Sequence, residues 1–192
     1  DVLLAALPGL LQLGVQVVVH GQGDRQLEDA FRTVAAGHRG RMAASIGYEE
    51  QTARRLTAAA DISLTASRFE PCGLTTMYAM RYGALPVARP VGGLADTVVD
   101  ADRASGAAAS GFVFAEESVD GMVACVRRAT ARYDGPDWSP IQRAAMERDF
   151  SWERSARRYL ALYRGLRGDP SAPDEIGTPD DDAAEYQVPE AA

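Results

Sequence analysis

Helical and strand patterns alternate over the first 132 residues of this chain, and that order strongly limits the fold. Short apolar runs and segments with apolar residues at helical spacing follow one another, separated by turns that contain glycine. Helices are expected at residues 2–11, 25–36, 50–60, 73–83 and 119–132, and strands at 15–19, 42–46, 61–65, 85–88 and 111–114. This spacing predicts a Rossmann-like α/β fold with a parallel, doubly wound sheet.

Two further helices are expected after this alternation, at residues 139–147 and 152–166, with Ser151 as the cap of the second. After residue 167 the chain has eight of its 27 acidic residues, four of its 10 prolines and no basic residue. We therefore expect one domain over residues 1–167 and an acidic, disordered tail over residues 168–192. A docking segment for a partner is the alternative for the tail.

The composition argues against several classes of function. Acidic and basic residues nearly balance over residues 1–167, so no basic stripe for nucleic acid is expected. The sequence has no run of about 18 apolar residues, as a membrane span needs, and no basic-then-apolar start typical of a signal peptide. The two cysteines are far apart, which favours a reducing cytoplasm, and scattered histidines and cysteines predict no metal site.

Residues 68–76, Arg-Phe-Glu-Pro-Cys-Gly-Leu-Thr-Thr, join a lone carboxylate to the start of an expected helix. Glu70 falls in the loop after an expected strand, at the edge where parallel sheets bind ligands. Unpaired amides at a helix start attract phosphate, and Gly73 lets a bulky anion approach the backbone. The combination suits a sugar carried on phosphate. The alternatives are a surface ion pair between Glu70 and Arg68, and a first helical turn at Thr75 without a ligand.

Two turns nearer the N-terminus also follow expected strands. Residues 21–24, Gly-Gln-Gly-Asp, begin like a dinucleotide fingerprint, but Gln26 stands at its third glycine position. A tight strand-to-helix turn capped by Asp24 is therefore the favoured interpretation. Tyr48 follows Gly47 after the strand at 42–46, where its ring could stack on a nucleobase or pack in the core.

Other residues invite a functional and a structural interpretation. Gly92 and Gly93 could form a simple turn or admit a sugar against the backbone. Cys72 is not expected to be a nucleophile, because no histidine is near it in sequence. Trp138 and Trp152 are expected to be core residues or helix anchors rather than platforms for a glucan.

Four segments occur in an order and spacing that closely resemble the C-terminal domain of bacterial glycogen synthases. They are Ile-Gly-Tyr at 46–48, Ser-Arg-Phe-Glu-Pro-Cys-Gly-Leu-Thr at 67–75, Gly-Gly-Leu-Ala-Asp-Thr-Val at 92–98 and Asp-Phe-Ser-Trp at 149–152. The resemblance runs from about residue 1 to residue 166 and leaves out the acidic tail. It implies a retaining glucosyltransferase of the GT-B type, whose two Rossmann-like domains close over ADP-glucose and a growing α-1,4-glucan.

The resemblance implies a role for each matching position. Glu70 would hydrogen-bond the glucose hydroxyls as the catalytic carboxylate, and Tyr48, next to Gly47, would stack on adenine. The rest of the donor pocket would be Cys72, the diphosphate-binding amides of Gly73, Leu74 and Thr75, and the glycine pair Gly92 and Gly93. Tyr78 stands where many related transferases have a second glutamate, so a two-carboxylate mechanism is not supported. No cofactor is implied.

The resemblance also implies parts that we expect to be missing here. In the family, an Arg-Leu-x-x-Gln-Lys-Gly segment with the basic pair for the phosphates precedes the first helix of this chain, and an N-terminal GT-B domain precedes that segment. The missing part includes a central first strand, so two strand edges are expected to be unpaired. We expect a donor-binding part that is inactive alone. A non-catalytic module for nucleotide-sugars or glucan, and a transferase that uses a UDP-sugar, are the alternatives.

Overall fold

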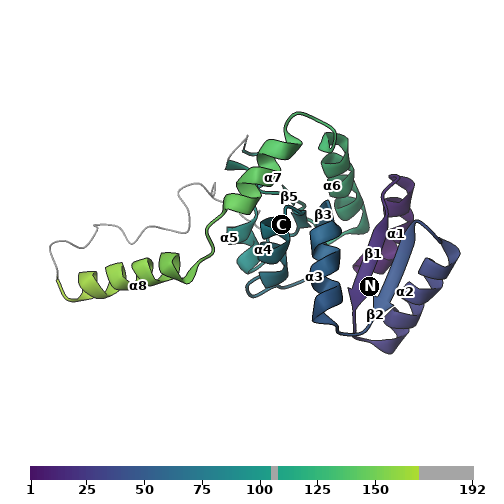
Figure 1. Ribbon diagram of the computed structural model, residues 1–192, viewed down its shortest axis with the longest axis horizontal. Helices are drawn as coiled ribbons and strands as arrows, with labels where there is room; N and C mark the ends of the chain where they lie inside the picture. The colour runs from purple at the N-terminus through teal and green to yellow at the C-terminus, as the bar shows by residue number, and fades with distance from the viewer. Residues whose placement is uncertain (105–107, 169–192) are drawn as a thin grey trace, which may run out of the picture.

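The computed structural model describes residues 1–104 and 108–168, and Figure 1 shows how the elements are arranged. The helices are α1 (Val2–Gln12), α2 (Arg25–Gly37), α3 (Glu50–Ala59), α4 (Leu74–Arg81), α5 (Gly93–Thr97), α6 (Val119–Arg132), α7 (Trp138–Glu147) and α8 (Trp152–Leu166). The strands are β1 (Val17–Gly21), β2 (Met42–Ile46), β3 (Ile62–Thr65), β4 (Leu85–Ala88) and β5 (Phe112–Val113). The predicted alternation is confirmed. Apart from Gly168, the tail that we predicted to be disordered lies outside the described residues.

The strands form two sheets in which every pairing is parallel. One sheet has the order β1-β2 and the other the order β3-β4-β5. Val17 is opposite Met42 in the first, and Val87 stands between Leu64 and Phe112 in the second. The predicted parallel sheet is confirmed. It is divided between β1 and β3, each of which has a hydrogen-bonded neighbour on one side.

A cavity of about 310 Å³ separates the two sheets. Its walls come from the edges of β1 and β3 and from α1 and α6, and they include Leu10, Ile62, Leu64 and Val126. Most of these side chains are apolar, and open strand edges leave backbone amides and carbonyls without ladder partners. None of the predicted site residues lines this cavity. It is therefore a gap in the sheet between β1 and β3 and not part of the candidate site.

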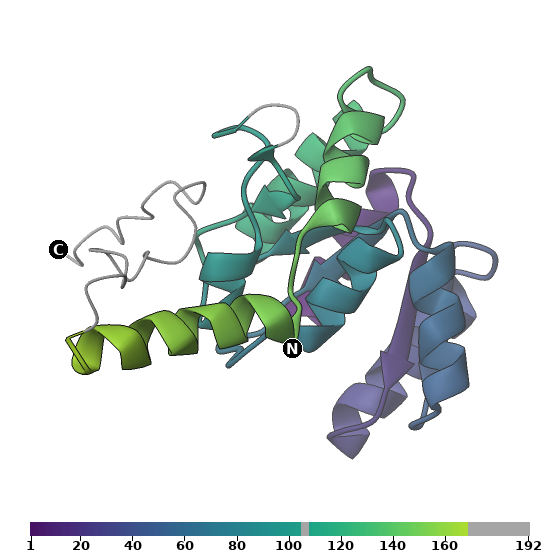
Figure 2. The same cartoon turned by 60° about the vertical axis from the view of Figure 1, so that its left-hand side comes forward.

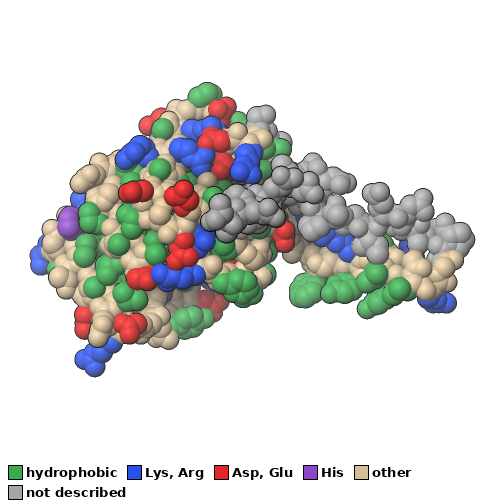
Figure 3. Space-filling view, turned by 180° about the vertical axis from the view of Figure 1, so that it is seen from behind, with side chains coloured by type: hydrophobic (Ala, Val, Ile, Leu, Met, Phe, Trp, Pro, Cys, Tyr) green, Lys and Arg blue, Asp and Glu red, His purple; other side chains and the backbone are tan. Residues whose placement is uncertain are grey.

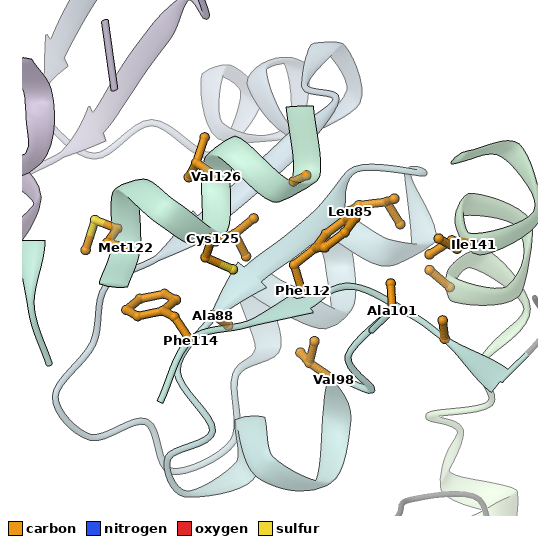
Figure 4. Packing of buried hydrophobic residues seen from close by; sticks show 14 of the residues in the cluster. Leu85, Ala88, Val98, Ala101, Phe112, Phe114, Met122, Cys125, Val126 and Ile141 are labelled. Carbon is orange, nitrogen blue, oxygen red and sulfur yellow. The ribbon is translucent and has the colours of Figure 1, made fainter. Parts of the chain in front are cut away.

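The main core surrounds β4, whose four residues are all buried. Leu85 and Phe112 from the sheet meet Cys125 and Val126 of α6 (Figure 4). The ring of Phe112 also stacks on Trp138, with ring centroids 6.3 Å apart. Trp138 is buried, which confirms it as a core residue. The position of β4 fixes the loops after β3, β4 and β5 relative to one another.

The helix α8 extends away from this core (Figures 1 and 2). Its start is capped as predicted, since the amide of Arg154 donates to Ser151 Oγ at 3.4 Å. None of its residues is buried, and hydrophobic side chains follow one side of it in Figure 3. The interpretation of Trp152 as a core residue or anchor is wrong, because its side chain is 85% exposed. No helix within residues 1–104 and 108–168 is long and apolar enough to cross a membrane.

Candidate functional site

The loop after β3 holds the carboxylate of Glu70 in place. Ser67 Oγ donates to Glu70 Oε2 at 3.3 Å, and the amide of Gly73 donates to Glu70 Oε1 at 3.2 Å. The residue is half-buried at the carboxyl end of the three-stranded sheet. Arg68 forms its ion pairs with Asp1 and with another loop rather than with Glu70. Glu70 is therefore a positioned carboxylate and not one half of a surface ion pair with its neighbour.

The start of α4 has the properties of an anion site. Gly73 precedes the helix in the left-handed conformation, with φ 81°, and no side chain caps the helix. Amides in a first helical turn have no acceptor within the helix, and the helix dipole adds positive potential there. The hydroxyls of Thr65 and Thr76 are 3.2 Å apart and tie this turn to β3. Leu74 and Thr75 provide first-turn amides, whereas the amide of Gly73 donates to Glu70.

The two glycines at 92 and 93 bring a second loop onto the first. The alternative of a simple turn holds for Gly92, which lies in a turn, but Gly93 begins the short helix α5. Its amide donates to the carbonyl oxygen of Glu70 at 2.9 Å. A Cβ at Gly93 would lie 2.7 Å from the carbonyl oxygen of Cys72, and one at Gly92 would overlap the carbonyl oxygen of Glu70. Glycine is needed here because two backbones meet.

Tyr48 stands at the carboxyl end of the other sheet. It follows Gly47, whose amide donates to the carbonyl oxygen of Gly21 at 2.9 Å. The side chain of Tyr48 is 82% exposed, so the alternative of core packing is wrong for this residue. The capped turn expected nearby is confirmed, since Asp24 accepts from the amide of Gln26 at 2.9 Å. The ring of Tyr48 is thus available to stack on a planar ligand.

The cysteines differ sharply in their surroundings. Cys72 is exposed in the loop between Glu70 and α4. Cys125 is buried in the core, where burial raises the pKa of its thiol although Arg128 opposes the shift. Within the part of the chain that the structure describes, no group of three or more histidine, cysteine or acidic side chains is placed to hold a metal ion.

Sequence reasoning missed a charged cluster beside this loop. Glu117 forms an ion pair with Arg68, with Oε1 2.5 Å from Nε, and accepts a hydrogen bond from Arg89 Nη1 at 3.1 Å. Arg68 follows β3, Arg89 follows β4 and Glu117 follows β5. A sequence signal did exist, because charged residues just after successive parallel strands converge at one edge of a sheet. The structure was needed to show which of these residues pair with one another.

Comparison with known proteins identifies the relatives of this chain. Glycogen synthases of Paramagnetospirillum magneticum and Yersinia pestis (strain Pestoides F) are 50% and 48% identical over 171 and 169 residues, or 88% and 86% of the chain. The alignments span 35% and 36% of those proteins. The chain therefore spans about a third of the length of these relatives, and the resemblance to glycogen synthases is confirmed over that part.

Solved structures show the same relationship. The catalytic domain of Starch Synthase IV from Arabidopsis thaliana, bound to ADP and acarbose, has a TM-score of 0.75 at 33% identity, covering 84% of this chain and 34% of that one. Sucrose-phosphate synthase from Thermosynechococcus elongatus has a TM-score of 0.62 at 23% identity, covering 87% of this chain and 42% of that one, which shows a common fold. The family model described as glycosyl transferases group 1 matches residues 1–132. The chain belongs to this family of glycosyl transferases.

Proposed function

We propose that residues 1–167 are the donor-binding domain of a glycogen synthase, which transfers glucose from ADP-glucose to the non-reducing end of an α-1,4-glucan with retention of configuration. The carboxylate of Glu70, held beside the uncapped start of α4, carries this proposal. The identity to glycogen synthases over the same residues supports it. An N-terminal GT-B domain would complete the active site, a further parallel strand would fill the gap between β1 and β3, and the enzyme would act in the cytoplasm.

The arrangement suits a reaction in which a diphosphate leaves and the anomeric carbon gains positive charge. The first-turn amides of Leu74 and Thr75 would bind the diphosphate and stabilise its charge as the bond to glucose breaks. The carboxylate of Glu70 would accept hydrogen bonds from the glucose hydroxyls and orient the sugar. The acceptor hydroxyl would then attack from the face that the diphosphate leaves, which retains the configuration, and would pass its proton to the departing phosphate oxygen. Tyr48 would stack on the adenine.

Removing the ring of Tyr48 is expected to weaken binding of ADP. Stacking of a base on an aromatic side chain contributes about 1–3 kcal/mol, so Tyr48→Ala should raise the dissociation constant of ADP about 5- to 150-fold. Tyr48→Phe should bind ADP about as well as the native chain, because stacking needs the ring rather than the hydroxyl. Isothermal titration of each variant with ADP measures the effect.

Tyr163→Ala is the matched control, because Tyr163 is also an exposed tyrosine but lies on α8. It should leave ADP affinity unchanged, and the exposed position of Tyr48 should leave the stability of Tyr48→Ala unchanged. Equal affinities for native and Tyr48→Ala chains would contradict the stacking role. Titration with UDP tests the alternative donor, and tighter binding of UDP than of ADP would favour it. Donor binding that never leads to turnover, even with an N-terminal GT-B domain supplied, would favour the alternative of a binding module.

The exposed cysteine offers a second test of the same pocket. Iodoacetamide at pH 8 should modify Cys72 at least about tenfold faster than Cys125, because Cys125 is buried and the raised pKa of its thiol leaves less thiolate. Saturating ADP-glucose should slow the modification of Cys72 and leave that of Cys125 unchanged. Mass spectrometry of the digested chain follows both sites separately. Modification of Cys72 at the same rate with and without ADP-glucose would place the donor elsewhere.

A further inference from the structure

One carboxylate is shared by two arginines where three strand-end loops meet. Glu117 Oε1 is 2.5 Å from Arg68 Nε, and Glu117 Oε2 is 3.1 Å from Arg89 Nη1. Arg68 also pairs with Asp1, the cap of α1, at 2.7 Å. These contacts join the loops after β3, β4 and β5 to the start of α1. They form a compact charged cluster at the carboxyl edge of the sheet.

Arg89 is not fully satisfied by this cluster. Its side chain is 14% exposed, and its Nε atom is buried with no hydrogen-bond partner. A buried guanidinium loses its water, and an unpaired buried donor raises the free energy of the folded chain. Glu117 contacts Arg89 through a single nitrogen, Nη1. The contact of Glu117 with Nη1 therefore does not satisfy the whole guanidinium, and an anion could reach it only at the Nη end, by displacing Glu117.

The cluster lies next to the candidate donor site. Arg89 precedes the glycines of the loop whose amide at Gly93 donates to the carbonyl oxygen of Glu70 at 2.9 Å. Arg68 stands two residues before Glu70, and it is more than half exposed. The same two loops thus carry the two guanidiniums and the positioned carboxylate. Arg68 is paired with Asp1 and Glu117, and Arg89 is paired with Glu117, so an anion would gain the charge of both arginines when it displaces Glu117.

We propose that Arg68 and Arg89 form a second phosphate site for the nucleotide-sugar donor, which Glu117 occupies until the donor arrives. This inference rests on the proposed function and assigns residues of this chain to the phosphates. Guanidinium groups match phosphate oxygens well, and a diphosphate carries more charge than one carboxylate. Binding would exchange the contacts of Glu117 for contacts to the diphosphate. The arginines would then also stabilise the charge of the departing diphosphate.

Neutralising Glu117 tests this exchange, because the exchange predicts that ADP affinity rises when the carboxylate is removed. Glu117→Gln should tighten ADP binding to the 192-residue chain about 3- to 10-fold, since the amide competes less well for the arginines. Arg89→Met should weaken ADP binding about tenfold or more, with Arg89→Lys in between. Isothermal titration with adenosine, AMP and ADP gives the comparison. The effect of Glu117→Gln should be absent with adenosine and largest with ADP.

Glu116→Gln is the matched control, because Glu116 is the neighbouring glutamate and interacts with Ser118 rather than with the arginines. It should leave every affinity unchanged. Thermal unfolding of each variant shows whether Arg89→Met is folded. If Arg89→Met is unfolded, the ADP affinity of Glu117→Gln alone tests the inference. Unchanged or weaker ADP binding by Glu117→Gln would overturn the inference. The proposed function would still hold after such a result if the native chain binds ADP and Tyr48→Ala weakens that binding. If the native chain does not bind ADP, both fail.

Discussion

Replacing Glu70 with alanine should lower glucose transfer from ADP-glucose about 10²- to 10³-fold in a full-length protein that contains this chain. The carboxylate is fixed by Ser67 and by the amide of Gly73, so its position is set before the donor binds. Groups fixed in this way contribute most when charge develops in the transition state. Initial rates with ADP-glucose and a glucan primer measure the loss.

The affinity for ADP separates a sugar-binding role from a structural role of Glu70. ADP lacks glucose, so Glu70→Ala should change its dissociation constant much less than it changes turnover. Loss of the acceptor for the amide of Gly73 should itself cost about 1 kcal/mol of stability, which urea unfolding detects. Glu147→Gln, at an exposed glutamate on α7, is the control and should be fully active. Equal losses of turnover and of ADP affinity would show that Glu70 only shapes the loop.

Much of the fold could be predicted because local patterns determine it. The bounds of α6 and β2 agree with the apolar spacing, since each buries one face against a neighbour. The strand expected at 15–19 begins later, at Val17, whose amide donates to the carbonyl oxygen of Arg41. Pairing with β2 sets that start, and periodicity does not report pairing. Trp152 was mispredicted for a similar reason, because an apolar pattern does not tell whether anything covers the helix.

The part of the candidate site that lies within one continuous segment could be predicted from the sequence. Residues 67–75 include the carboxylate, the left-handed glycine and the helix start, and these are together in the structure. Glycines at 92 and 93 were noticed, but their partner was not, because the contact joins loops more than 20 residues apart. The contact between Arg89 and Glu117 was even less predictable, since it depends on β4 and β5 being neighbours in the sheet. Such long-range contacts follow from topology.

A methyl group at Gly92 is expected to unfold this junction between loops. Gly92 has φ 51° and ψ −133°, a combination that residues other than glycine rarely adopt. Strain of this kind costs about 1–3 kcal/mol, and the new Cβ would also overlap the carbonyl oxygen of Glu70. Displacing that carbonyl removes its hydrogen bond from the amide of Gly93, for about 1 kcal/mol more. Gly92→Ala should therefore lower the free energy of unfolding by about 3 kcal/mol or more, as measured in urea.

Two other glycines separate the strain from the overlap. Gly40 has φ 78° but no atom within 4 Å of a Cβ, so Gly40→Ala should cost about 1 kcal/mol through strain alone. Gly23 has neither a positive φ nor a close neighbour, and Gly23→Ala should be neutral or slightly stabilising. Gly92→Ala should also weaken ADP-glucose binding, because the shifted carbonyl moves the backbone that carries Glu70. If Gly92→Ala costs no more than Gly40→Ala, the two loops are not in contact, and the site has no fixed geometry on which its chemistry could depend.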